Sequence, residues 1–226
     1  MHAFLISLLP NVSSKLPELW EAIRDTLVML LWSGGISFVI GLALGIIVTV
    51  TRKGNILENA AVFQVLDKTI SFFRSIPFII LLTGVMPLSR LLMGTAIGVK
   101  GAIVPLVFGA VPFFARQVES SLAEVDKGLI EAALSMGSSP VGIIIRVYLK
   151  ECIASIARST TITAISLLGL TAMAGAVGAG GLGDFAIRYG HDRNQTDVTW
   201  VTIVILVLMV SIIQLIGNIV AKKNTH

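Results

Sequence analysis

Two runs of 24 residues without a charged side chain constrain the fold of this chain more than any other feature. They extend from Leu27 to Val50 and from Val198 to Ala221. At about 1.5 Å of rise per residue, a helix of this length reaches roughly 36 Å, enough to cross the ~30 Å hydrocarbon core of a bilayer with some tilt. Lys222 and Lys223 follow the second run, as expected at a cytoplasmic membrane surface. Both runs are therefore predicted to be membrane-spanning helices.

The composition of the whole chain agrees with an integral membrane protein. Of the 226 residues, 55% are hydrophobic and 13% are charged, and the mean hydropathy is +0.90. The sequence predicts an all-α protein with about five spans, at residues 27–50, 70–89, 95–115, 159–179 and 198–221. One cysteine, Cys152, excludes an intrachain disulfide, and the three histidines are too scattered for a zinc pattern. No metal or redox site is indicated.

Basic residues are distributed unevenly between the two sides of this predicted topology. The segments after the first, third and fifth spans hold Arg52, Lys53, Lys68, Arg116, Lys127, Arg146, Lys150, Lys222 and Lys223. The other side holds Lys15, Arg24, Arg90, Lys100, Arg188 and Arg193. Because basic residues near span ends favour the cytoplasm, we expect the N-terminus outside and the C-terminal tail, residues 222–226, inside. Residues 1–26 then form a periplasmic or interfacial segment, and residues 116–152 form the longest cytoplasmic loop.

The three middle spans contain charges, prolines and small residues, unlike the two clean runs. Arg74 and Pro77 lie in the second span, Lys100 lies in the third, and the fourth is rich in Ser, Thr, Gly and Ala. Such residues need partners inside a helix bundle or along a water-filled cavity. The middle spans are expected to line a pathway, or to pack closely against one another, since small residues serve both purposes.

Within the cytoplasmic loop, the stretch "EAALSMGSSPVGII" (residues 131–144) predicts a bent pair of short helices. Asp126 is placed to cap a helix that begins near Lys127, and Gly137 stands where a helix end favours positive φ. Ser139 and Pro140 form the usual pair of N-cap and first helical position. The first helix is expected to expose a flank of small residues, Ala132, Ala133, Ser135 and Gly137, beside the adaptable Met136. This flank suits docking into a groove of another protein, and an amphipathic helix lying on the membrane is the alternative.

The same stretch resembles the EAA signature of ABC importer permeases, which is Glu-Ala-Ala, three residues, then Gly. Glu131 begins the match, and Val147 and Leu149 stand where the family usually has Ile and Leu; Lys150 departs from the usual Pro. The resemblance implies the type I ABC importer permease fold, in which this loop is a coupling helix seated in a cleft of a cytoplasmic ATPase. The implied coupling residues are Glu131, Ala132, Ala133, Met136, Gly137, Ser139 and Pro140.

Three further segments resemble the permeases of methionine ABC importers: "FRSIPFIILL" from Phe73, "AIVPLVFGAVPFFAR" from Ala102 and "AMAGAVGAGGLGDF" from Ala172. The implied function is the import of methionine, in one or both enantiomers, across the bacterial inner membrane. The implied partners are a second copy of this chain, two copies of the ATPase, an extracytoplasmic methionine-binding lipoprotein and the lipid bilayer. Nucleic acid is not an expected partner. Homodimers also have the commonest closed symmetry, and pairing would double a wall of only five spans.

Neither of two common nucleotide-binding patterns is supported by the sequence. Residues 178–183, "GAGGLG", satisfy G-x-G-x-x-G, but the dinucleotide fingerprint requires a preceding strand in a βαβ unit, and this one follows a predicted membrane helix. The P-loop pattern G-x-x-x-x-G-K-[ST] does not occur in the sequence. The chain is therefore expected to be a transport subunit and not an enzyme, without a cofactor of its own, while ATP and Mg are bound by the partner ATPase.

Candidate residues of the translocation path lie in the second and fourth spans. Met173 and Leu170 are candidates for an outer gate, because flexible apolar side chains from two paired subunits could close a path; ordinary bundle packing is the alternative. Arg74 marks the inner mouth of the path or extends to the interface as a snorkelling side chain. Pro77 is expected to kink the second span and act as a hinge, and Pro105 and Pro112 are expected to kink the third.

Two alternative functions remain open from the sequence. One is a permease of the same fold for another small solute, which a ligand screen of the binding lipoprotein would distinguish. The other is a passive channel or membrane scaffold, which would not copurify with an ATPase.

Overall fold

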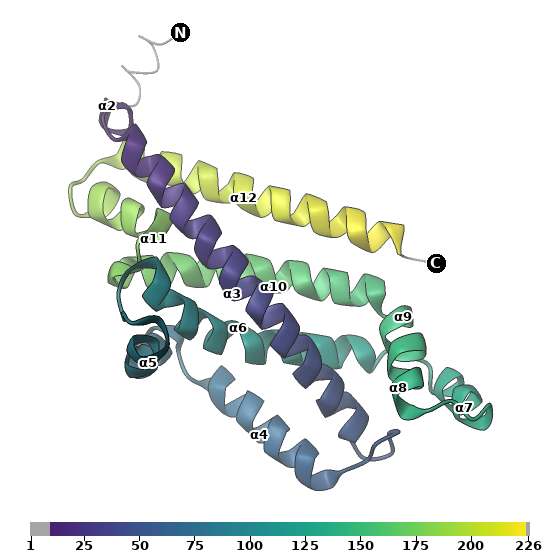
Figure 1. The fold of residues 1–226 in the computed structure, drawn as a ribbon. Coiled ribbons are helices and arrows are strands. Elements are labelled where there is room, and N and C mark those ends of the chain that lie inside the picture. Colours follow the sequence, from purple (N-terminus) through teal and green to yellow (C-terminus); the bar gives the residue numbers. More distant parts are fainter. Residues whose placement is uncertain (1–9, 225–226) are drawn as a thin grey trace. The chain divides into compact units, whose positions relative to one another are not determined.

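The computed structural model describes residues 10–224, and the regular structure among these residues is helical throughout (Figure 1). The elements are α2 (Pro10–Ser13), α3 (Leu16–Thr51), α4 (Ala60–Ser75), α5 (Phe78–Met93), α6 (Gly98–Leu122), α7 (Lys127–Ser135), α8 (Pro140–Ile143), η1 (Ile144–Tyr148), α9 (Leu149–Glu151), α10 (Ile153–Ala174), η2 (Gly175–Ala179), α11 (Gly181–Phe185), η3 (Ala186–His191) and α12 (Thr196–Lys223). The predicted all-α class is confirmed. By length and composition, α3, α6, α10 with η2, and α12 can each cross a membrane, and the pair α4–α5 makes a fifth span if it counts as one.

Helix α3 is continuous through two segments that were predicted to be separate. The expected interfacial segment ends at residue 26 and the expected first span begins at Leu27, but one helix runs from Leu16 to Thr51. Its only proline, Pro17, lies in the first turn, where a missing N–H removes no helical hydrogen bond. Nothing in the following residues therefore interrupts the helix. Residues 1–9 of the expected N-terminal segment lie outside the described residues.

The expected second span, residues 70–89, is not one helix. Helix α4 ends at Ser75 and α5 begins at Phe78, with Ile76 (φ −85°, ψ 123°) and Pro77 (φ −55°, ψ 133°) in extended backbone between them. A proline disfavours the helical conformation of the residue before it, which places Ile76 in the β region. Pro77 therefore breaks this segment, a stronger effect than the predicted kink. By contrast, α6 continues through both Pro105 and Pro112.

The described residues form two compact units. The first contains residues 10–35, 77–108 and 164–213. Its core is a cluster of Val12, Leu19, Ala22, Leu182, Phe185 and Val198. The backbone N–H of Leu182 donates to Thr26 Oγ1 at 2.8 Å, which fixes the start of α11 to α3.

The second unit contains residues 36–76, 109–163 and 214–224. Its core joins α3 to α6, to the loop after α6 and to the start of α10, through Val50, Phe114, Val118, Leu122, Ala133, Ile143, Tyr148, Cys152 and Ile156. Helices α3 and α6 approach closely, because a Cβ atom built on Gly45 would lie 2.6 Å from Val118 Cβ and 2.8 Å from the carbonyl oxygen of Ala115. Only glycine permits this contact.

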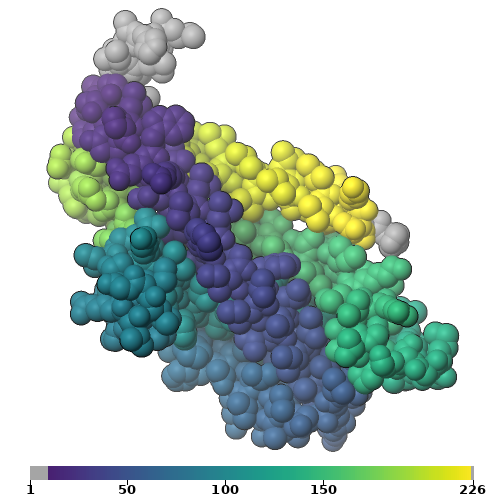
Figure 2. Space-filling view, viewed as in Figure 1, coloured from purple at the N-terminus to yellow at the C-terminus, as the bar shows by residue number. Residues whose placement is uncertain are grey.

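Helix α12, drawn in yellow in Figure 2, exposes many large apolar side chains. None of its most hydrophobic stretch is buried, although this stretch is the most apolar among the candidate spans. The exposed side chains include Trp200, Val204, Val207, Leu208, Ile212, Leu215, Ile216 and Ile219. An apolar surface of this extent requires a non-aqueous neighbour, as a bilayer provides.

Candidate functional site

The loop between α6 and α10 folds into an elbow of two short helices, α7 and α8, with caps at the residues predicted from the sequence. Asp126 Oδ1 accepts a hydrogen bond from the backbone N–H of Gly128 at 2.7 Å, so α7 begins at Lys127. Gly137 has φ +74°. The backbone N–H of Gly137 donates to the carbonyl oxygen of Leu134 at 2.9 Å. The backbone N–H of Ser138 donates to the carbonyl oxygen of Ala133 at 3.0 Å. This paired arrangement is a Schellman end, which favours glycine at the left-handed position.

The second helix of the elbow begins as predicted. Ser139 Oγ accepts from the backbone N–H of Gly142 at 3.2 Å, and Pro140 is the first helical residue. The chain then continues through η1 and α9 to Cys152, whose backbone dihedrals (φ −98°, ψ 9°) separate α9 from α10. Lys150, which replaces the family's usual Pro, lies inside α9. The exit of the elbow is therefore helical up to Cys152.

One face of the elbow is anchored to the membrane helices of its own unit. Ala133 is 5% exposed and Ile143 is fully buried. Both pack in the cluster that includes Val118 and Leu122 of α6, with Ile130 at its edge. The burial of Ala133 corrects the prediction that it lies on the exposed flank. At helical spacing, Ala133 falls on the side of Ile130, which faces inward, and its neighbour Ala132 faces outward.

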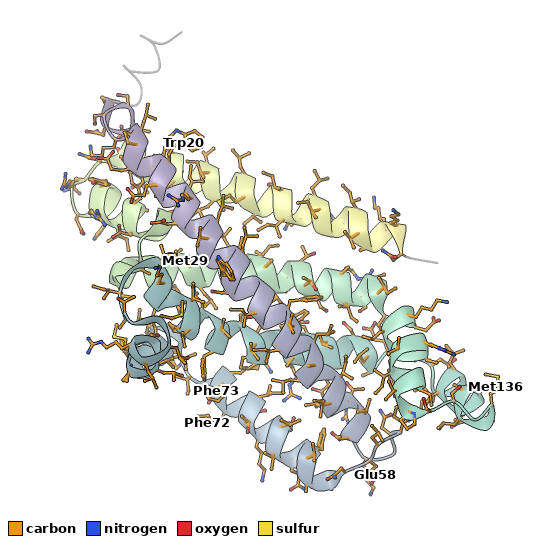
Figure 3. The ribbon with its side chains drawn as sticks, viewed as in Figure 1. Trp20, Met29, Glu58, Phe72, Phe73 and Met136 are labelled. Atoms are coloured by element: carbon orange, nitrogen blue, oxygen red, sulfur yellow. The ribbon has the colours of Figure 1, made fainter. Side chains whose placement is uncertain are left out.

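The opposite face of the elbow is open. Glu131, Ala132, Ser135, Gly137, Ser139 and Pro140 are all exposed. Met136 is 78% exposed and stands at the tip of the elbow (Figure 3). Leu134 and Val141 add exposed apolar surface at 47% and 63%. The structure thus gathers six of the seven predicted coupling residues, Met136 among them, on one exposed elbow and buries only Ala133.

A hydrogen bond that the sequence did not indicate ties the elbow to the end of α3. The Tyr148 hydroxyl donates to Asn55 Oδ1 at 2.7 Å, and Asn55 Nδ2 donates to the carbonyl oxygen of Thr49 in the last turn of α3 at 2.9 Å. Burial raises the pKa of Tyr148 above its usual value, so the hydroxyl remains a proton donor. Two hydrogen bonds thus connect the elbow to the last turn of α3 through Asn55. The signal was absent from the sequence because the two residues lie 93 positions apart.

The end of α6 and the start of α10 are joined by a second polar cluster. Cys152 Sγ donates to the carbonyl oxygen of Ser121 at 3.1 Å, and the hydroxyls of Ser121 and Ser159 are 3.0 Å apart. Ser155 Oγ donates to Ser121 Oγ at 3.1 Å. These bonds link the elbow's exit to two long helices, so the elbow is attached firmly to the unit that carries it.

A comparison with protein families identifies the family of this chain. Residues 25–225 match the family of binding-protein-dependent transport system inner membrane components. The chain belongs to this family. It is therefore a multi-pass inner membrane permease subunit, which acts in transport and not as an enzyme.

Individual relatives of the permease are similar along most of its length. The methionine import system permease protein MetP of Bacillus subtilis is 45% identical over 211 residues, covering 93% of this chain and 94% of that protein. The D-methionine transport system permease protein MetI of Escherichia coli K12 is 45% identical over 150 residues, covering 65% and 69%. Among solved structures, an inward-facing form of the MetNI methionine ABC transporter superposes with a TM-score of 0.92 at 42% identity, covering 94% of the permease and 99% of that chain.

The two gate candidates of the permease share helix α10. Met173 is 41% exposed and Leu170, one turn earlier, is half-buried. They belong to the first unit, as does Pro77, which precedes α5. Arg74 is exposed in the last turn of α4, in the second unit. The structure thus places Met173 and Leu170 on one helix, whereas Arg74 lies in a different unit from them.

Near Met173, the chain turns back at the "GAGGLG" segment, so that the backbone before the turn contacts the backbone after it. A Cβ atom on Gly183 would lie 2.2 Å from the carbonyl oxygen of Ala172, and one on Gly175 would lie 2.6 Å from the backbone nitrogen of Asp184. These glycines are required for the sharp return of the chain from η2 into α11. Among residues 10–224, this G-x-G-x-x-G pattern follows helix α10 and begins within η2, and no strand precedes it.

A pocket next to this return is too small for an amino acid. It is lined by Leu82 and Met86 of α5, Pro105 of α6, and Ala174 and Val177, and its volume is about 10 Å³. That volume accommodates roughly one water molecule. A single permease chain therefore offers no chamber of amino-acid size at this position.

The second unit contains a charged network that the sequence analysis did not find. Arg116 of α6 donates to Asp67 Oδ1 and Ser71 Oγ of α4, at 2.8 and 3.1 Å, and to Glu119 Oε2 at 2.6 Å. Glu119 is 8% exposed, so its hydrogen bond with Arg116 offsets part of the cost of burying its carboxyl group. Asp67 and Arg116 lie 49 positions apart, and no local pattern marks them as partners.

Proposed function

We propose that the permease imports methionine as a homodimer, driven by two copies of a cytoplasmic ATPase and supplied by an extracytoplasmic methionine-binding lipoprotein. The exposed face of the α7–α8 elbow is the observation that supports this function best. It presents the EAA residues on a rigid, capped loop whose other face is anchored by Ala133 and Ile143. Such a loop transmits force and offers no group for chemistry on a substrate. ATP and Mg belong to the partner ATPase.

The methionine assignment is supported by the relatives. MetP of Bacillus subtilis is named for methionine import and MetI of Escherichia coli for D-methionine transport. The 42% identical chain at a TM-score of 0.92 comes from a methionine ABC transporter. We infer that both enantiomers are carried.

The orientation of the permease follows from its basic residues. The elbow and the Lys222–Lys223 end of α12 face the cytoplasm, and the N-terminus lies outside. The path lies on the two-fold axis, where Met173 and Leu170 from each copy form the outer gate. Arg74 lies at the inner mouth, and the break at Pro77 is a hinge.

Uptake in whole cells tests the proposed function. In a strain without other methionine carriers, the permease is expressed together with its ATPase and lipoprotein, and uptake of labelled methionine is measured at low external concentration. We expect uptake that unlabelled L- and D-methionine compete away and that leucine does not. Loss of uptake on deletion of the permease alone is also expected. If the deletion left methionine uptake unchanged, the permease would be assigned to another solute.

A further inference from the structure

Three cationic side chains of the first unit surround one aromatic ring. Around Tyr189, Lys15 Nζ lies 5.2 Å from the ring centroid, Arg188 Cζ 5.8 Å and Arg193 Cζ 4.9 Å. Tyr189 is half-buried and packs edge-on against Phe185 of the first unit's core, at 5.2 Å between centroids. The ring is thus held in place, and it gathers the three charges around it. We call Lys15, Arg188, Arg193 and Tyr189 the basic cluster.

The positive charge of the basic cluster is only partly neutralised within residues 10–224. Asp184 pairs with Arg188. Among residues 10–224, no carboxylate lies within ion-pair distance of Lys15 or Arg193. Asp197, in the first turn of α12, accepts hydrogen bonds from the backbone and side chain of Asn11, both at 3.0 Å. Two uncompensated cations beside a third repel one another, and a bound anion would remove this cost.

The basic cluster lies at the boundary between polar and membrane-crossing chain. The candidate spans α3 and α12 begin at Leu16 and Thr196. Lys15 and Arg193 precede these starts by one and three residues. Trp20 and Trp200, one turn inside each span, are 69% and 67% exposed, and Trp20 is labelled in Figure 3. Exposed tryptophans at this depth mark the headgroup level of a bilayer.

We propose that the basic cluster binds the phosphate of an anionic phospholipid, whose acyl chains lie along the exposed apolar surface of α3 and α12. Arg193 and Lys15 supply the charge and the hydrogen-bond donors that a phosphate needs. The cation–π contacts with Tyr189 hold the Lys15 and Arg193 side chains at the interface in the absence of an anion. A lipid is favoured over an acidic protein partner because the cluster stands beside interfacial tryptophans and lipid-length apolar helices, where a headgroup phosphate is already present.

Quenching of tryptophan fluorescence by brominated lipids tests this site on the full chain in bilayers. The protein has three tryptophans, so a Trp32→Phe background leaves Trp20 and Trp200, next to the cluster, as reporters. We expect brominated phosphatidylglycerol at low mole fraction to quench more strongly than brominated phosphatidylcholine. In Lys15→Gln/Arg193→Gln, this preference should fall by roughly tenfold or more, since each interfacial cation contributes about fivefold.

Matched variants make the result specific. Lys222→Gln/Lys223→Gln removes the same two charges at the other end of α12 and should leave the preference intact, as should the charge-conserving Lys15→Arg/Arg193→Lys. Equal quenching by both lipids in the parent protein, or a preserved preference in Lys15→Gln/Arg193→Gln, would overturn the proposal. So would loss of the preference on adding inorganic phosphate but not chloride of equal ionic strength, which would identify a site for soluble phosphate. Loss of lipoprotein binding in the double variant without any lipid preference in the parent would assign the cluster to a protein partner instead.

Discussion

Glu131 is the residue of the elbow whose removal tests coupling most directly. It is exposed on α7, and its side chain has no hydrogen-bond or ion-pair partner among the described residues. If Glu131 pairs with a basic group of the ATPase, Glu131→Ala leaves that group unpaired at a cost of about 2–5 kcal/mol in docking. We expect ATP-driven uptake to be lost while membrane insertion and dimerisation are retained. Uptake and substrate-stimulated hydrolysis are measured together after reconstitution with the ATPase. Glu151→Ala, an exposed carboxylate outside α7, is the control and should remain active.

Gly137 tests the geometry of the same elbow. Its φ of +74° costs a residue with a Cβ atom roughly 1 kcal/mol or more, although no other atom lies within 4 Å of that position. Gly137→Leu should therefore bend the end of α7 and weaken docking, and its bulk adds to the effect at a close-approach surface. Gly137→Asn tolerates positive φ and should be less impaired. Full uptake by both Glu131→Ala and Gly137→Leu would refute a coupling role for this loop.

At the scale of elements, the contact between α3 and α6 depends on glycines that face bulky side chains. A Cβ atom on Gly41 would lie 2.8 Å from Phe114 Cδ1, and one on Gly45 would lie 2.6 Å from Val118 Cβ. Both pairs lie in the second unit. Two helix backbones therefore approach through small residues, as in other membrane bundles.

Gly45→Leu should separate these two helices. Overpacking of this kind costs about 1–3 kcal/mol, whereas leucine by itself favours helix more than glycine does. We expect a fall in Tm of the detergent-solubilised permease, followed by scanning fluorimetry. Gly35→Leu, in the same helix with no atom within 4 Å of the added Cβ, is the matched control and should leave Tm nearly unchanged. An equal effect of both substitutions would show that propensity or solubility, and not packing, is responsible.

At the scale of the whole molecule, the proposed orientation places residue 135 inside and residue 192 outside. Ser135→Cys and Asp192→Cys test it by labelling with a membrane-impermeant maleimide in intact cells and after permeabilisation. Asp192→Cys should react in intact cells, and Ser135→Cys only after permeabilisation. Labelling of both positions from the same side would contradict the five-span topology.

The native thiol should not interfere with this experiment. Cys152 is 4% exposed, and burial, with the nearby Glu124 and Glu151, raises its pKa to about 11. The reactive form is the thiolate, which at pH 7 is then only about one part in ten thousand. Its labelling should remain slow at neutral pH and increase toward pH 11.

Local signals predicted the elbow well: Asp126, Gly137, Ser139 and Pro140 all occupy the cap positions expected of them. Capping and turn chemistry depend on neighbours within a few residues, so a linear sequence contains the necessary information. The clean apolar runs predicted α3 and α12 for a similar reason, because their length alone matches the bilayer.

By itself, the sequence determined the all-α membrane class, the elbow and its caps, and the resemblance that led to the permease family. The tertiary structure decided which face of each element is buried and which is exposed. It buried Ala133 and exposed Ala132, turned the predicted kink at Pro77 into a break, and assembled the Tyr148–Asn55 bond, the Arg116 network and the basic cluster around Tyr189. These features join residues far apart in the chain, and their energies arise only when packing removes water and brings the partners within contact distance.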